Sequence, residues 1–279
     1  KASQTQTALE KAQDTFTLAE GRYKSINTFQ VTDDYVNALK SYVNNPYNIS
    51  NERAKWKEHR EKAKENLKKV NQSNIDLNNF KSNPSDKTIA VDANHLTNEQ
   101  KIELSNFANS LINQIRERFG TPKTVVTKGM IDVSDKITAG YVVDNWRVEA
   151  GHHNKLINRI AREYGLPAID DESGQALENL SSINNGDKIH TMDDAKKWVY
   201  ESISGLLFNG WEWLHAQSIT GLTSQGANKE YFALGLSSST GRTSAHFFTV
   251  SDKQVSGNKL DKTEVPNNNT SESIVKAYN

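Results

Sequence analysis

The sequence has no cysteine, which excludes disulfide bonds and thiolate metal sites from all 279 residues. Proline occurs only 5 times, so few helices are interrupted by it. Neither sign of charge is in excess, because 34 Lys and Arg residues balance 34 Asp and Glu residues, so net charge favours neither nucleic acid nor an anionic membrane as a partner. No apolar run is long enough to span a membrane and no signal peptide is recognisable, although both ends of the sequence look like cuts through a longer protein.

Residues 1–90 are predicted to form a helical stalk segment. Near its start, apolar residues follow a heptad spacing, and these are Leu9, Ala12, Phe16, Ala19, Tyr23 and Ile26. A short helix over residues 33–43 and a longer one from Ser50 to Phe80 are expected next, the longer one with an apolar heptad phase beside a face of Lys and Glu. The simplest arrangement is an antiparallel helical pair. The alternative is a helical subdomain packed on the main domain.

Residues 91–252 have a different pattern and are predicted to form the main domain. Capping boxes at Thr97–Gln100 and Thr191–Asp194 open two of its helices. The expected helices cover residues 97–119, 132–149, 154–164 and 191–207, and the expected strands cover residues 123–127, 231–237 and 245–250. Helices followed by a late hairpin predict an α+β sandwich. Residues 253–279 are predicted to be a polar linker and the start of a returning stalk helix.

Two histidines and two glutamates lie beside aromatic or apolar residues, which indicates semi-buried groups, and they are His152, Glu178, Glu201 and His215. Such a set could bind a divalent metal or exchange protons. The expected metal ligands are His152 and His215, with His153 as the alternative to His152. Because there is no cysteine, we expect an open site of modest affinity for Zn²⁺ or a similar ion that folding does not require. Glu178 and Glu201 are the expected catalytic carboxylates if the protein is an enzyme.

Short motifs surround these four residues. They are Gly151-His152, Glu178-Asn179-Leu180, Trp198-Val199-Tyr200-Glu201, His215-Ala216-Gln217 and Ala233-Leu234-Gly235-Leu236. In this order they resemble the CAP superfamily of cysteine-rich secretory, antigen five and pathogenesis-related proteins, whose usual forms are Gly-Glu-Asn-Leu, Trp-x-x-Glu and His-Tyr-Thr-Gln. The second of these forms is matched completely. Leu177 replaces the Gly of the first, and the third is one residue shorter here.

The resemblance covers about residues 97–250, and the flanking sequence extends it. A cysteine-free CAP-like domain that follows residues 28–40, between helical segments, resembles the surface exclusion proteins of Gram-positive conjugative plasmids and related stalked adhesins. The resemblance implies an α-β-α sandwich in which two His and two Glu residues line one cleft open to solvent.

The function that this resemblance implies is binding: a CAP-like domain on a stalk that acts in adhesion or conjugative surface exclusion. The expected location is the bacterial cell surface, with wall anchoring in the full-length protein. The expected partner is a protein or glycan on a host or neighbouring bacterial cell, without nucleic acid and without membrane insertion. The alternatives are a metal-assisted hydrolase or protease and the capture of a small apolar ligand or lipid.

Several other residues have simpler interpretations. Trp211 or Trp213 could form a carbohydrate platform, but core or cleft-wall packing is the plainer explanation. Ser218 follows His215 by one helical turn, yet no acid is evidently placed to complete a catalytic triad. No partner is evident for three further histidines, His59, His95 and His246.

Overall fold

The computed structural model describes residues 2–184, 189–224 and 226–279, so Lys1 of the predicted stalk lies outside the described residues. Within these ranges the body is a four-stranded sheet in the order β1-β3-β4-β2. The strands are β1 (Thr124–Val126), β2 (Glu178–Asn184), β3 (Glu230–Ser239) and β4 (Arg242–Ser251). β1 is parallel to β3, whereas β3 and β2 are antiparallel to β4.

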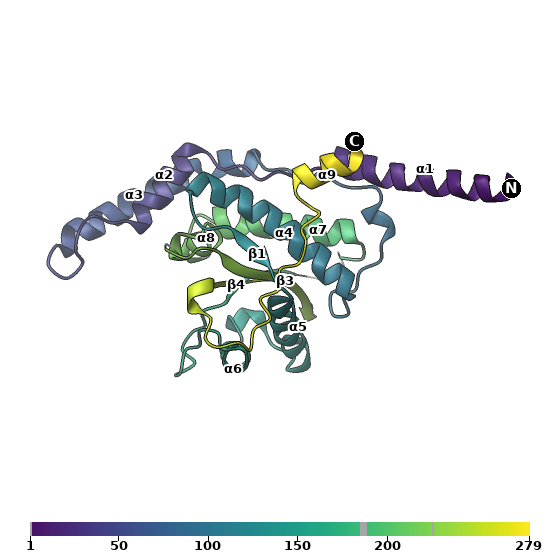
Figure 1. Cartoon of the computed structure of the whole chain (residues 1–279). Coiled ribbons are helices and arrows are strands. Elements are labelled where there is room, and N and C mark those ends of the chain that lie inside the picture. Colours follow the sequence, from purple (N-terminus) through teal and green to yellow (C-terminus); the bar gives the residue numbers. More distant parts are fainter. Residues whose placement is uncertain (1, 185–188, 225) are drawn as a thin grey trace.

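Helices cover both faces of this sheet (Figure 1). The covering helices are α4 (Asn98–Phe119) and α7 (Met192–Phe208) on one face and α5 (Lys128–Val143) and α6 (Asn154–Tyr164) on the other. Both predicted capping boxes are present, and Gly120 ends α4 in the left-handed conformation with φ of 66°. The predicted α+β sandwich is therefore confirmed.

The hairpin between β3 and β4 follows from its turn residues. Thr240 and Gly241 both have positive φ, as a two-residue hairpin turn between Ser239 and Arg242 requires. β2 was not expected, because its sequence has no apolar alternation and carries serines in its middle. It becomes a strand by pairing with β4, with Asn179 opposite Phe247.

The boundaries of two predicted helices are wrong. α5 runs over Lys128–Val143 instead of 132–149, because Thr127 caps its start by accepting a hydrogen bond from the Met130 amide. Asn145, with φ of 44°, turns the chain away after its end. α3 (Arg53–Asp76) begins after the predicted Ser50 cap, and the Glu52 side chain at its N-terminus makes no capping bond.

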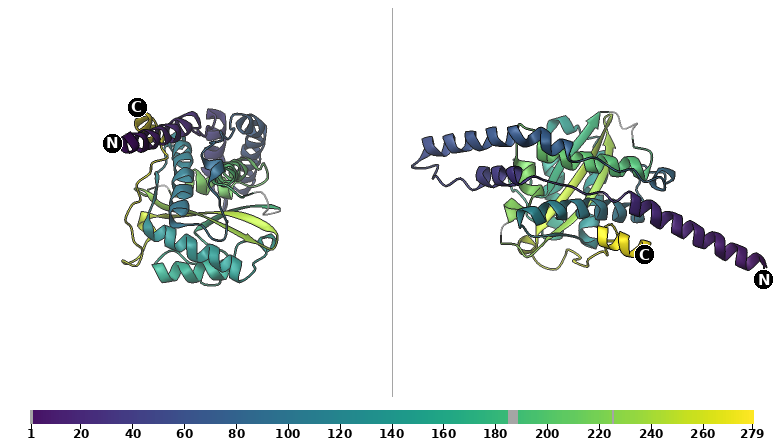
Figure 2. Two further views of the ribbon diagram at one scale, coloured as in Figure 1. Left: turned by 90° about the vertical axis from the view of Figure 1, so that its right-hand side faces the viewer. Right: turned by 90° about the horizontal axis from the view of Figure 1, so that it is seen from above.

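The N-terminal helices divide into two parts. α1 (Ala2–Lys24) projects from one end of the body, and the last helix, α9 (Ser271–Tyr278), packs against its base (Figures 1 and 2). Tyr23 and Tyr278 are stacked with ring centroids 4.5 Å apart, and Phe16 lies 6.0 Å from the same Tyr278 ring. The last helix therefore packs directly on the first.

α2 (Asp33–Val43) and α3 form a helical hairpin that projects in the opposite direction (Figure 1). Its base shares the hydrophobic core of the body. The Tyr35 hydroxyl donates to the Leu207 carbonyl at 2.7 Å, and the Tyr42 ring lies 5.4 Å from Trp213. The pair is thus antiparallel, and its base packs on the main domain instead of continuing the α1 stalk.

Candidate functional site

Glu178 is the centre of the site. It is the first residue of β2, and its side chain is fully buried. Three groups bond its carboxylate: the Tyr141 hydroxyl donates to Oε2 at 2.7 Å, His152 Nδ1 lies 2.7 Å from Oε2, and His246 Nδ1 lies 2.6 Å from Oε1. Burial by itself would raise the pKa of Glu178, but the charge and hydrogen bonds of His246 and His152 outweigh it and lower the pKa to about 2. The group is therefore a carboxylate at neutral pH, and the expectation that it faces an open cleft is wrong.

His152 forms the outer side of this cluster. It stands between Gly151, whose φ is 92°, and the first turn of α6. An ionised carboxylate only accepts hydrogen bonds, so His152 donates through Nδ1, and Nε2 carries a lone pair when the ring is neutral. The side chain is 27% exposed. His152 therefore offers a free ring nitrogen near the surface while Glu178 fixes its orientation.

The neighbouring His153 turns the other way. Its Nε2 lies 2.8 Å from Asp144 Oδ2, and its ring stacks on Trp146 with centroids 4.0 Å apart. Its backbone amide donates to the Tyr141 hydroxyl at 2.8 Å. Of the two candidate histidines, the structure places His152 beside Glu178 and leaves His153 buried in a structural role.

His215 lies on α8 (Leu214–Ile219), with its ring centroid 6.1 Å from that of His152. Its Nδ1 is 3.0 Å from Asn179 Oδ1, an acceptor, so here too the ring donates through Nδ1 and keeps a lone pair on Nε2. Burial lowers the pKa of His215, as does nearby His152, although Glu212 and Glu178 act in the opposite direction. The imidazole is therefore neutral at physiological pH, as a metal ligand must be.

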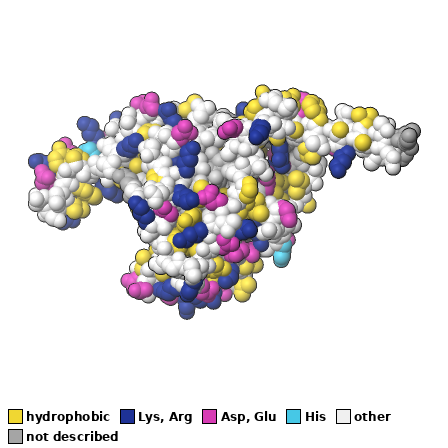
Figure 3. All heavy atoms as spheres, viewed as in Figure 1, with side chains coloured by type: hydrophobic (Ala, Val, Ile, Leu, Met, Phe, Trp, Pro, Cys, Tyr) yellow, Lys and Arg dark blue, Asp and Glu magenta, His cyan; other side chains and the backbone are white. Residues whose placement is uncertain are grey.

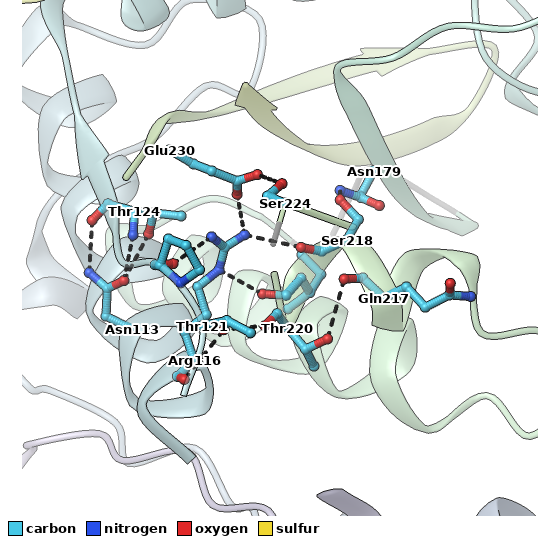
Figure 4. Close-up of polar contacts among 12 residues, drawn as sticks. Asn113, Arg116, Thr121, Thr124, Asn179, Gln217, Ser218, Thr220, Ser224 and Glu230 are labelled. Carbon is cyan, nitrogen blue, oxygen red and sulfur yellow. Dashed lines mark hydrogen bonds and ion pairs between the residues drawn. The ribbon is translucent and has the colours of Figure 1, made fainter. Parts of the chain in front are cut away.

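A second buried polar cluster positions α8 (Figure 4). The Arg116 guanidinium is completely buried, forms an ion pair with Glu230, and donates to the carbonyls of Ser218 and Ile219 at 3.0 Å each. These carbonyls are at the C-terminal end of α8, where a cation is favourable. Asn179 Nδ2 donates to Ser218 Oγ at 2.8 Å, so one side chain connects this cluster to His215.

Glu201 is not part of the cluster. Its side chain is 53% exposed and lies 3.8 Å from Lys197. Lys197, Glu201 and Gly205 are spaced by four residues and are all exposed, so they form one solvent-facing stripe of α7. The Trp-x-x-Glu match placed Trp198 correctly in the core, but the helix turns the glutamate of the motif outward.

His246 is the site residue that sequence reasoning missed. It is fully buried on β4, bonds Glu178 through Nδ1, and lies 2.7 Å from Ser237 Oγ through Nε2. The other two histidines without an expected partner also have one: His59 lies 3.2 Å from Ser41 Oγ, and His95 lies 2.8 Å from Asp92. Nothing local marks His246, because only the pairing of β2 with β4 brings it to Glu178.

The tryptophans of the α8 loop differ from each other. Trp211 is 75% exposed, whereas Trp213 is buried against Tyr42 and belongs to the core. Trp213 is therefore excluded as a carbohydrate platform. The Ser218 hydroxyl accepts from Asn179 and has no histidine partner among the described residues, so the site contains no activated serine.

The site can offer a metal ion two nitrogen ligands, Nε2 of His152 and Nε2 of His215. Among the described residues, no group of three or more His, Cys, Asp or Glu side chains is placed to hold a metal ion. His152 and His215 each have an oriented ring with a free Nε2, the arrangement in which a partner on Nδ1 supports a metal-bound imidazole. An ion bound there would take its remaining ligands from water or from a partner.

No protein-family model and no curated protein matches the sequence. Among solved structures, the chain is similar to the CAP domain of enterococcal PrgA, with a TM-score of 0.61 and 18% sequence identity over 76% of this chain and 89% of that one. The CAP-like fold predicted from the motifs is therefore confirmed. No helix in the described ranges has both the length and the apolar character that crossing a membrane requires.

Proposed function

We propose that this chain is a binding domain displayed on a helical stalk at a bacterial surface, where it acts in adhesion or conjugative surface exclusion. The observation that carries the proposal is the pairing of α1 with α9, because the outgoing and returning helices leave the CAP-like body at one end and expose the rest of it (Figure 2). The likeness to the CAP domain of enterococcal PrgA supports the same assignment. The protein is proposed to be extracellular and to be anchored to the cell wall at full length.

The proposed partner is a protein or glycan on a host or neighbouring bacterial cell. Acidic and basic side chains are interspersed over the face in Figure 3, without a broad surface of one sign that would favour nucleic acid or an anionic membrane. Trp211 offers an exposed aromatic ring beside the His215 helix, as a sugar-stacking or protein-binding residue would. Contacts of this kind need surface area and do not depend on the buried carboxylate.

A metal-assisted hydrolase or protease is the second candidate. The observation in its favour is the pair of neighbouring imidazoles, His152 and His215, which we propose bind Zn²⁺ or another divalent ion with modest affinity. A bound ion would supply a Lewis acid and an acidified water. Glu178 would hold the His152 ring, but both of its oxygens are occupied, and Glu201 is on another surface, so neither is placed as a general base.

A mating assay separates the two candidates. Recipient cells display the full-length protein that contains this chain, either as wild type, as His152→Ala/His215→Ala, or as the control His59→Ala/His95→Ala, and conjugation frequency is counted. We expect wild-type exclusion in both variants, because a broad binding surface does not require two imidazoles. Lost exclusion in the first variant alone, together with loss of a defined cleavage product and unchanged thermal melting, would establish the hydrolase instead.

A further inference from the structure

A cavity of about 290 Å³ lies beside β3, on different elements from the His152 and His215 site. One wall is formed by α5, including Ile131, Ala139 and Val143. Another is formed by the segment before α4, and the floor includes Leu236 of β3. Val143 is 82% exposed, so an apolar wall faces solvent there. A cavity with an apolar wall on a sheet edge has the features of a ligand site.

The edge of β3 is open at this cavity because β1 is short. β1 pairs with β3 only as far as Phe232, whereas β3 continues to Ser239. The Glu230 amide donates to the Lys123 carbonyl, so the backbone groups of Glu230 point toward the β1 side. Along a strand paired on its other edge, every second residue repeats this direction. The backbone groups of Leu234, Leu236 and Ser238 therefore point to the open edge.

Side chains occupy two of these three positions. Ser105 Oγ bonds both the amide and the carbonyl of Leu234, at 3.0 and 3.2 Å. The Asn94 carboxamide binds Ser238 in the same two-bonded way, with Oδ1 2.6 Å from the amide and Nδ2 2.9 Å from the carbonyl. Between them, no residue that the structure describes supplies a partner for the outward amide and carbonyl of Leu236. Because the Leu236 side chain belongs to the core, the atoms it offers the cavity are this backbone pair.

The geometry of this pair selects the chemistry of its ligand. The amide and carbonyl of one strand residue point the same way, and a residue of an antiparallel extended peptide bonds both at once. A single trans secondary amide, such as an N-acetyl group, points its N–H and C=O in opposite directions and cannot do so. Residues directly opposite each other in an antiparallel pair point their side chains to the same face of the sheet. The Leu236 side chain faces away from α5, because a side chain at the preceding Gly235 would meet Ser134 and Thr138 of α5. The peptide residues on either side of the bridging residue therefore face the apolar α5 wall around Val143. Lys101 and Asp135 line the same cavity but neutralise each other in an ion pair at 2.6 Å, so they do not favour a charged ligand.

We propose that this cavity binds an extended peptide segment of another protein, with one residue paired to Leu236 and an apolar residue next to it against the α5 wall. This is strand addition limited to a single bridge, since Ser105 and Asn94 close the edge on either side. Because only one residue pair forms, the binding of a peptide to a single cavity is weak and transient. The proposal does not depend on the function proposed for the His152 and His215 site, which lies on other elements.

The test is amide NMR on ¹⁵N-labelled protein titrated with the blocked peptide acetyl-Val-Ser-Val-amide, in which the central serine pairs with Leu236 and a flanking valine faces α5. We expect a saturable shift of the Leu236 amide. The same peptide with an N-methylated serine should bind roughly tenfold more weakly, because one hydrogen bond is lost and its partner carbonyl is left unpaired. Ala139→Trp should abolish binding by filling the cavity from its exposed rim, whereas Ala54→Trp, on the exposed surface of α3, should bind as wild type does.

Three results would overturn the proposal. The first is no shift of Leu236 at millimolar peptide, and the second is equal binding of the N-methylated peptide. The third is a Leu236 shift with N-acetylglucosamine but not with the peptide, which would assign the cavity to a sugar. Hydrogen exchange of the free protein gives an independent check: Leu236 should exchange faster than Leu234, and equal protection would reveal an internal partner and exclude the site.

Discussion

The inner and outer halves of the His/Glu site are held differently. Glu178, His246 and Tyr141 are buried and bonded to one another, so the inner half is part of the folded core. His152 and His215 each donate one hydrogen bond to the interior through Nδ1, and their second ring nitrogen, Nε2, is left for a ligand. The predicted site residues therefore do not share one role: Glu178 belongs to the inner half, whereas His152 and His215 form the outer half. The inner half supports the fold, and only the outer half is available to a ligand.

The largest expected effect comes from removing the carboxylate of the inner half. Glu178→Ala leaves His246 without its charge partner and leaves donors unpaired, which should lower the free energy of unfolding by about 3–5 kcal/mol. Urea denaturation followed by circular dichroism measures this loss. Glu201→Ala is the matched control, and its exposed side chain should change the value by less than about 0.5 kcal/mol. Equal losses in the two variants would contradict the division of the site.

Acid should act through the same carboxylate. The pKa of Glu178 is about 2 when folded and 4.5 ordinarily, so its contribution to stability is complete above pH 4.5 and is lost as the pH falls toward 2. The difference corresponds to about 3 kcal/mol. Urea midpoints measured between pH 6 and pH 2 should fall more steeply for wild type than for Glu178→Gln. Parallel pH profiles would show that this carboxylate does not control acid stability.

Substitutions in the outer half should change the affinity for Zn²⁺ and not the stability of the fold. His215→Ala should weaken Zn²⁺ binding roughly tenfold or more, as the loss of one of two imidazole ligands requires, while the unfolding free energy changes little. Titration calorimetry gives the affinities, and His95→Ala provides a control with a well-exposed imidazole. Equal Zn²⁺ affinity in wild type and His215→Ala would remove the metal proposal.

The smallest effect on folding is expected at Trp211. Trp211→Ala should alter the unfolding free energy by less than about 0.5 kcal/mol, because the ring is mostly in solvent. Cell-binding assays should nevertheless show weaker adhesion if this ring contacts the partner. Unchanged adhesion would place the binding surface elsewhere on the domain.

Local signals in the sequence predicted much of the fold. The two capping boxes, Gly120 at the end of α4 and the β3–β4 turn were all correct, because each depends on residues within a few positions of one another. The order of the motifs also predicted the CAP-like fold, and it grouped His152, Glu178 and His215, which the structure places near one another. The outward position of Glu201 could have been inferred from its spacing to Lys197 and Gly205, since helix periodicity is itself a local property.

Tertiary structure alone decided the rest. Glu178 and His246 are 68 positions apart in the sequence and are brought together only by the β2–β4 register, which depends on strand pairing that no short segment encodes. The same applies to the burial of Glu178, to the choice of His152 over His153, and to Arg116 holding the end of α8. The sequence by itself determined which elements form and which residue types the site contains. Packing determined which of those residues are buried as structure and which reach a ligand, because burial depends on distant parts of the chain.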